Sequence, residues 1–194
     1  MAWPLFSSSG RQEEAAAEVK RALEIDPLSL IINSSAGRIF YLARQYDQAM
    51  EQLRKTLDMD PNFARAHFFL GQVYQQKGMF EEDIAEFKKA HQLDVNQYIL
   101  AGLGNAFAVS GRRGEAKKIL DELRESSRQR YASPYGIAVV YAGLGEKDQA
   151  FAWLEKAYKD RDETLTGLKV DPKLDSLRSD PRFQHLLRRA GPPQ

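Results

Sequence analysis

The chain has 194 residues, 43% of them hydrophobic and 28% charged, which is the composition of a folded protein rather than a disordered one. Its formal net charge of +1 gives no overall attraction to nucleic acid or to an anionic membrane, and the absence of cysteine excludes disulfides, thiolate catalysis and cysteine-ligated zinc. No run of about 18 apolar residues could span a membrane. The N-terminus is short, apolar and broken by Pro4, which makes it a poor signal peptide. We therefore expect a cytoplasmic protein.

Amphipathic helices are predicted along nearly the whole chain, because apolar residues recur with the helical period of about 3.6 and no segment alternates as a strand does. A first helix is expected within residues 10–27. Four helix pairs should follow, over residues 30–42 and 46–59, 64–77 and 80–93, 97–110 and 113–125, and 134–143 and 147–159. Near the end, Asp171 and Asp180 each stand before a proline, as capping residues do, so two short helices are expected there.

The sequence repeats with a period of about 34 residues, which is typical of one supersecondary unit stacked on copies of itself. One series of equivalent positions holds Ala15, Ala49, Asp83, Ala116 and Ala150, spaced by 34, 34, 33 and 34 residues. A second series holds Gly37, Gly71, Gly104 and Ala138. Arrays of this kind usually bind other molecules and do not catalyse reactions, so we expect no enzymatic activity.

Small residues at these positions are expected where the two helices of a pair approach closely, since a larger side chain would push them apart. Asp83 departs from this rule, because it places a carboxyl group where the other repeats have alanine. We expect either a local loosening at Asp83 or a partner for its carboxylate.

The pattern resembles the tetratricopeptide repeat family over residues 10–160. That family has small residues at positions 8, 20 and 27 of the repeat, an aromatic residue at position 11 and a proline at position 32. The matching residues are Gly37, Phe40, Ala49 and Pro61; Gly71, Tyr74 and Ala90; Gly104, Phe107 and Ala116; and Ala138, Tyr141, Ala150 and Ala157. The resemblance implies an all-α, right-handed superhelical solenoid of antiparallel helix pairs with a C-terminal capping helix.

We divide the chain into a non-repeat segment at residues 1–9, an array at residues 10–160, and a cap with a short tail at residues 164–194. The array would hold a half repeat at residues 10–29 and full repeats at about 30–63, 64–96, 97–130 and 131–163. The half repeat lacks its first helix, as in a truncated array. Either Trp3, Leu5 and Phe6 fold back onto its open face, or a second molecule covers it. The last segment resembles the cap of the tetratricopeptide region of bacterial multidomain regulators.

No catalytic, metal or cofactor site is evident in the sequence. The histidines, His67, His91 and His185, lack the spacing of metal ligands, and we expect His67 to serve packing. No phosphate-binding loop and no serine elbow occur. The basic stretch over residues 112–130 is interleaved with acidic residues at spacings that allow pairs within a helix, so we favour a solvated helix face over a nucleic-acid site.

The resemblance also implies that the first helix of each pair lines a concave binding face. Its residues would be Arg38, Tyr41, Arg65, Phe68, Gln72, Gln76, Tyr98, Asn105 and Tyr135. Aromatic side chains would form pockets, amides would bond the backbone of an extended peptide, and Arg38 with Arg65 would hold a carboxylate. The alternative is that several of these residues merely pack helix against helix.

We therefore predict a noncatalytic scaffold that binds a peptide or protein partner on its concave face. Two alternatives stay open. The chain could be a self-associating module that forms a homodimer through its open N-terminal end. It could instead be a docking or sensory fragment of a larger bacterial regulator.

Overall fold

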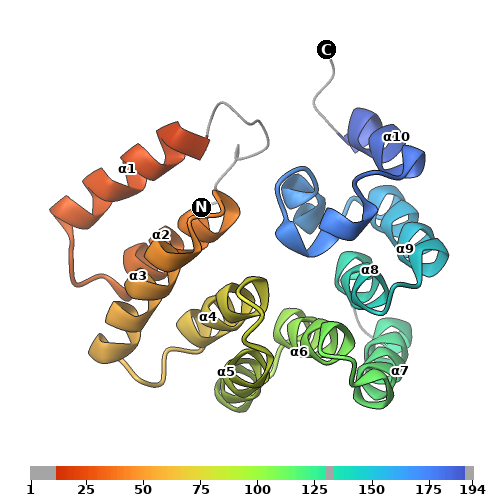
Figure 1. Ribbon diagram of the computed structural model, residues 1–194, viewed down its shortest axis with the longest axis horizontal. Coiled ribbons are helices and arrows are strands. Elements are labelled where there is room, and N and C mark those ends of the chain that lie inside the picture. Colours follow the sequence, from red (N-terminus) through yellow and green to blue (C-terminus); the bar gives the residue numbers. More distant parts are fainter. Residues whose placement is uncertain (1–11, 130–132, 191–194) are drawn as a thin grey trace. The chain divides into compact units, whose positions relative to one another are not determined.

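The computed structural model describes residues 12–129 and 133–190, and within these ranges it contains helices and no strands (Figure 1). The all-α class that the helical period predicts is therefore confirmed. The expected packing of Trp3 and Phe6 falls outside the described residues. The chain forms two compact units that divide within α6, one reaching to Ile99 and the other beginning at Leu100.

The helices lie almost where the periodicity places them. The first is α1 (Gln12–Ile25), and the next pairs are α2 (Leu30–Leu42) with α3 (Tyr46–Met59), and α4 (Ala64–Gln76) with α5 (Phe80–Leu93). They are followed by α6 (Gln97–Val109), α7 (Arg113–Gln129), α8 (Pro134–Gly143) and α9 (Lys147–Lys159). The expected end of α7 at residue 125 is wrong, because nothing in the sequence that follows stops a helix before the stretch that leads to Pro134.

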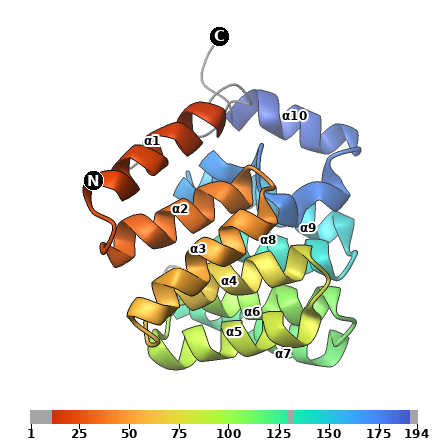
Figure 2. The ribbon, with the colours of Figure 1, turned by 60° about the vertical axis from the view of Figure 1, so that its left-hand side comes forward.

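In the first unit, α1 to α5 pack as a series of neighbours. The pairs α2–α3 and α4–α5 are in contact along their lengths, and α2 also packs on α1 and on α4 (Figure 2). Gly37 makes the close approach of α2 to α3 possible, since a Cβ atom there would lie 2.6 Å from Cδ2 of Leu53. At Gly71, one repeat later, a Cβ atom would lie 3.0 Å from the ring of Phe87. Small residues at these positions therefore set the spacing of the pairs.

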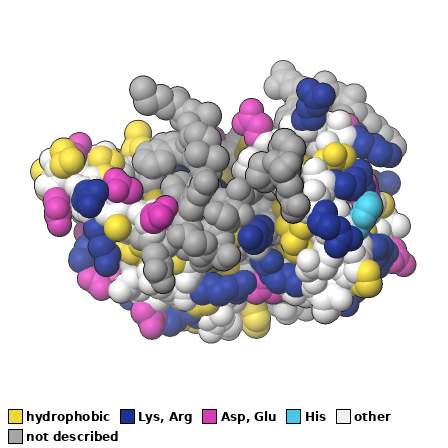
Figure 3. Space-filling view, turned by 90° about the horizontal axis from the view of Figure 1, so that it is seen from above, with side chains coloured by type: hydrophobic (Ala, Val, Ile, Leu, Met, Phe, Trp, Pro, Cys, Tyr) yellow, Lys and Arg dark blue, Asp and Glu magenta, His cyan; other side chains and the backbone are white. Residues whose placement is uncertain are grey.

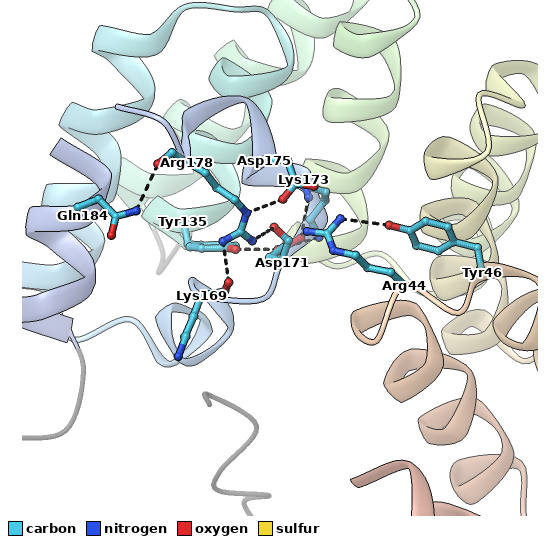
Figure 4. Close-up of polar contacts among 9 residues, drawn as sticks. All are labelled: Arg44, Tyr46, Tyr135, Lys169, Asp171, Lys173, Asp175, Arg178 and Gln184. Atoms are coloured by element: carbon cyan, nitrogen blue, oxygen red, sulfur yellow. Dashed lines mark hydrogen bonds and ion pairs between the residues drawn. The ribbon is translucent and has the colours of Figure 1, made fainter. Parts of the chain in front are cut away.

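The turns inside successive pairs share one backbone conformation. Gly78, Gly111 and Gly145 have φ angles of 72°, 81° and 75°, in the left-handed region that glycine adopts easily. In the α2–α3 turn the equivalent residue is Arg44, with a φ of 61°. Its guanidinium donates to the Tyr46 hydroxyl at 3.4 Å (Figure 4). The first turn therefore has the geometry of the others without their glycine.

In the second unit, α8 packs closely on α9 and also contacts α7. The chain continues through two 3₁₀ helices, η1 (Glu163–Gly167) and η2 (Pro172–Leu177), to α10 (Pro181–Ala190). The two short helices expected after Asp171 and Asp180 are thus present, and the first of them is 3₁₀. Their apolar side chains are buried, since Leu168, Leu174, Leu177, Phe183 and Leu186 are at most 1% exposed. These residues form the core of the cap.

Candidate functional site

The arginines predicted to bind a carboxylate lie on α2 and α4, which contact each other in the first unit. Arg65 is exposed, and Arg38 is half-buried. The Arg65 guanidinium donates to the Ser35 hydroxyl on α2 at 3.2 Å, and its central carbon lies 5.4 Å from the centre of the Phe69 ring. The hydrogen bond links Arg65 to α2, and the cation–π contact with Phe69 lies within α4 itself.

The charge at this place is positive. Partial burial of the guanidinium group lowers the pKa of Arg65, and repulsion by the positive charge of Arg38 lowers it further. Both stay cationic, because arginine keeps its proton in proteins. Among the residues that the structure describes, no carboxylate forms an ion pair with Arg65.

An apolar side chain lies on the same face of α4 as Arg65. Phe68 follows Arg65 by three residues, a spacing that places both on one side of a helix. Its ring is half-buried and packs on Phe69 and Phe87, with centroid distances of 5.3 Å and 5.6 Å. Gln76, at the end of α4, is also half-buried. This face thus combines a cation, an aromatic ring and an amide.

Four other predicted site residues are buried. Tyr41 is 1% exposed and Gln72 is 4% exposed, both in the first unit. In the second unit, the Asn105 amide donates to the Val139 carbonyl at 2.8 Å, and the Tyr135 hydroxyl donates to Asp171 at 2.7 Å (Figure 4). The Asn105 amide nitrogen and the Tyr135 hydroxyl therefore serve contacts inside the second unit. Tyr98, in contrast, is 48% exposed at the start of α6.

The sequence did not indicate a buried polar cluster that attaches the cap to α8. Asp162 is 3% exposed, and its Oδ2 atom accepts from the Ser133 hydroxyl at 2.6 Å and from the Tyr135 amide at 3.3 Å. Its Oδ1 atom accepts from the backbone and hydroxyl of Thr164. One aspartate therefore caps η1 and also neutralises the positive end of α8. The only signal in the sequence was its place as a capping residue.

A second cluster fixes the cap through Arg178. Its guanidinium bonds the Asp175 carboxylate at 2.5 Å, the Lys169 carbonyl at 2.6 Å and the Asp171 carbonyl at 3.1 Å (Figure 4). Asp171 also accepts from Tyr135, and Lys173 lies 3.4 Å from it. The donors and acceptors satisfy one another, so this cluster is structural.

A shallow pocket of about 430 Å³ lies between α9 and α10. Arg182 bonds Asp148 at 2.7 Å and Asp180 at 2.8 Å, and lies 4.2 Å over the Phe151 ring. The Arg182 partner lowers the pKa of Asp180 to about 2. Figure 3 shows basic side chains (dark blue) gathered around a histidine on the side where α10 lies in Figure 1. Because the pocket's arginine is already paired, it attracts an anion less than the face around Arg65.

Within residues 12–129 and 133–190, His, Asp and Glu side chains nowhere converge in threes as metal ligands would. In the same ranges, every helix is too short or too polar to cross a membrane.

Family models match most of the repeated part of the chain. A TPR repeat model matches residues 37–78, and tetratricopeptide repeat models match residues 64–94 and 102–164. The sequence matches no curated protein. These matches confirm the family resemblance that the repeat positions carry.

Solved structures are similar in fold. PilW, a type IV pilus biogenesis factor, is 22% identical with a TM-score of 0.58, over 91% of this chain and 84% of that one. Pseudomonas aeruginosa pilF is 20% identical with a TM-score of 0.56, over 95% and 86%. YrrB, described as a TPR protein with an unusual peptide-binding site, is 18% identical with a TM-score of 0.53, over 90% and 91%. The repeat models and these folds agree, and the chain belongs to the tetratricopeptide repeat family of protein-interaction scaffolds.

Proposed function

We propose that the chain is a noncatalytic scaffold that binds an extended segment of a partner protein on the α2–α4 face, with an acidic side chain of that segment between Arg38 and Arg65. The observation that carries the proposal is the pair of neighbouring guanidinium groups, of which Arg65 has no carboxylate partner in the described chain. A carboxylate there would remove the repulsion between the two cations.

The chemistry of the face suits a peptide ligand. An arginine can bind a carboxylate through two parallel N–H donors, which fixes the orientation of the ligand as well as its charge. Phe68 offers a half-buried ring for an apolar side chain of the ligand, and Gln76 offers donors and an acceptor for its backbone. The peptide-binding site described for YrrB, which shares the fold, lends support to this use of the repeats.

The proposal can be tested by selecting peptides from a random library on the immobilised chain and measuring their affinities by fluorescence polarisation. Selected peptides should contain an aspartate or glutamate whose amide analogue binds about tenfold more weakly or worse, since hydrogen bonds to charged groups contribute about 1.5–3 kcal/mol. Arg65→Gln and Arg38→Gln should each cause a similar loss.

Lys55→Gln is the matched control, because Lys55 is an exposed cation on α3 that pairs with Glu51. It removes the same charge and should leave affinity unchanged. If all three variants bind the peptides equally well, or if the selected peptides need no acid, the α2–α4 face is not the binding site.

A second candidate function is self-association, which exposed apolar side chains near the α1–α2 turn favour. Ile25, Leu28 and Ile31 are 85%, 75% and 62% exposed. A second copy that covered them would bury apolar surface at about 25 cal/mol per Å². Light scattering over a range of concentrations should then show a dimer that Leu28→Asp dissociates, whereas a monomer throughout would exclude this function.

A further inference from the structure

Asp83 occupies a place in α5 that alanine occupies in the other repeats. Ala49, Ala116 and Ala150 stand at the equivalent positions, and all are 0% exposed. Asp83 is also 0% exposed. A carboxyl group has therefore been placed in a contact between helices that otherwise admits only a methyl group.

The surroundings of Asp83 offer its carboxyl group little compensation. Neither of its side-chain oxygens meets the geometry of a hydrogen bond within the described chain. The nitrogen of the Gln75 amide on α4 likewise lacks such a bond, although it is close enough to the carboxyl group to favour its anion weakly. Ile84 and Phe87 on α5 are 3% and 1% exposed, so the contact is mainly apolar. An ionised carboxylate in such a place would be strongly disfavoured.

The charged groups of the α4–α5 pair do not compensate the carboxyl group either. On α4, Arg65 bonds Ser35, His67 bonds Glu86, and Lys77 bonds Asp47. On the first turn of α5, Glu81 and Glu82 are exposed acids. The positive end of α5 favours an anion only weakly compared with the effect of burial. Burial accordingly raises the pKa of Asp83 to about 8, and Gln75 lowers it by a smaller amount.

We propose that Asp83 is a pH-sensitive switch that loosens the α4–α5 pair when its carboxyl group gives up its proton to water. The neutral acid fits the contact between the helices, whereas the anion must reach water, which it can do only if α5 moves away from α4. Loosening would begin at this pair, since the same place is occupied by alanine in α3, α7 and α9.

The direction of the effect follows from the pKa shift. The carboxyl group of an opened pair ionises near its ordinary value of about 4, and that of the closed pair near 8. Between these values the open form releases a proton that the closed form keeps, so the equilibrium constant for opening rises up to tenfold for each pH unit. Below this range both forms are neutral, and above it both are charged, so the dependence ends.

Arg65 and Phe68 lie on α4, so opening would also weaken peptide binding; this consequence rests on the proposed function. The switch itself is tested without any peptide. A failure of the binding experiments would therefore leave it standing, and a failure of the switch would leave the binding face standing.

Hydrogen exchange of the α4 and α5 amides between pH 5 and 9, corrected for intrinsic exchange chemistry, measures the opening. The native chain should show opening that increases with pH in these helices. Asp83→Asn, which keeps the shape of the side chain without a titrating proton, and Asp83→Ala, which restores the residue of the other repeats, should abolish the dependence. Glu82→Gln removes an exposed acid from the same turn and should leave it unchanged.

The titration of the Asp83 carboxyl carbon, followed by NMR of the native chain, gives a readout that does not depend on how the variants fold. A midpoint well above that of exposed aspartates is expected. A midpoint near 4, or an opening profile that Asp83→Asn leaves unaltered, would overturn the proposal.

Discussion

Asn33 and His67 lie 34 residues apart and make the same contact, since each bonds the carbonyl of the proline that precedes its helix, Pro27 at 2.8 Å and Pro61 at 2.9 Å. Each also bonds a side chain 19 residues further on, Gln52 for Asn33 and Glu86 for His67. The two links attach the turn before α2 or α4 to both helices of the pair. One uses amides, and the other uses an imidazole and a carboxylate.

Removing the imidazole should weaken the second link. His67→Ala leaves the Pro61 carbonyl and Glu86 without their shared partner, and a buried group left unsatisfied costs about 1–3 kcal/mol. Urea denaturation followed by circular dichroism measures the free energy of unfolding. The double variant His67→Asn with Glu86→Gln copies the amide link of the preceding pair and should recover most of the loss. If the double variant is no more stable than His67→Ala, the two links are not equivalent.

Adding a single carbon at two glycines should have opposite effects. Gly37→Ala would bring a Cβ atom within 2.6 Å of Leu53 Cδ2 and should destabilise the chain by about 1–3 kcal/mol through overpacking. Gly114 lies in α7, and a Cβ atom added there would meet no atom within 4 Å. Gly114→Ala should therefore stabilise the chain by about 0.5–1 kcal/mol, because alanine has the higher helix propensity. The melting temperatures of both variants are measured by thermal unfolding. If both variants melt above the native chain, or both below it, the role given to Gly37 is contradicted.

The left-handed residue of the α2–α3 turn offers a stabilising change. Arg44→Gly should raise the free energy of unfolding by about 1 kcal/mol, because a non-glycine residue at a φ of 61° is strained. The Arg44–Tyr46 bond is long and exposed, so this contact of the arginine side chain contributes little. Gly78→Ala, in the equivalent turn of the next pair, should cost a similar amount. A loss of stability in Arg44→Gly would show that the arginine side chain matters more than the strain.

The attachment of the cap should depend on Asp162. Asp162→Ala leaves the Ser133 hydroxyl and the Tyr135 amide without their acceptor and should cost about 1–3 kcal/mol. Limited trypsin digestion should then cut faster after Lys169 and Arg178 in the cap. Asp160→Ala, which removes only an exposed ion pair with Lys156, should change neither stability nor cleavage appreciably. Equal cleavage rates in the two variants would place the attachment elsewhere.

The sequence predicts the helices well, because their signal is local. The helical period of the apolar residues, and the prolines and glycines that end helices, can each be recognised within a few residues of sequence. The expected bounds are accordingly correct for α2, α3, α5, α8 and α9. The end of α7 was missed because no residue there stops a helix. The type of residue at Arg44 gave no sign of its left-handed backbone, and only the spacing of 34 residues to Gly78 pointed to it.

The candidate site was less accessible to sequence reasoning. The repeat register places Arg38 and Arg65 on first helices of successive pairs, but it does not tell which polar residues there turn inward. Asn105 and Tyr135 stand at similar register positions and bond groups inside their unit. The links of Asn33 and His67 left a signal, because each residue follows a proline by six positions. The contacts of Asp162 left no signal beyond its place as a capping residue, since its partners lie 27 and 29 residues earlier in the sequence.

The double use of Asp162 limits how the molecule can be enlarged by engineering. A copied 34-residue module inserted between α9 and η1 would separate this aspartate from Ser133 and Tyr135 and expose the amides at the start of α8. A module inserted ahead of α8 would keep the terminal assembly whole. Designed lengthening of this protein should therefore proceed from its interior, with α8, α9 and everything after them moved as one block.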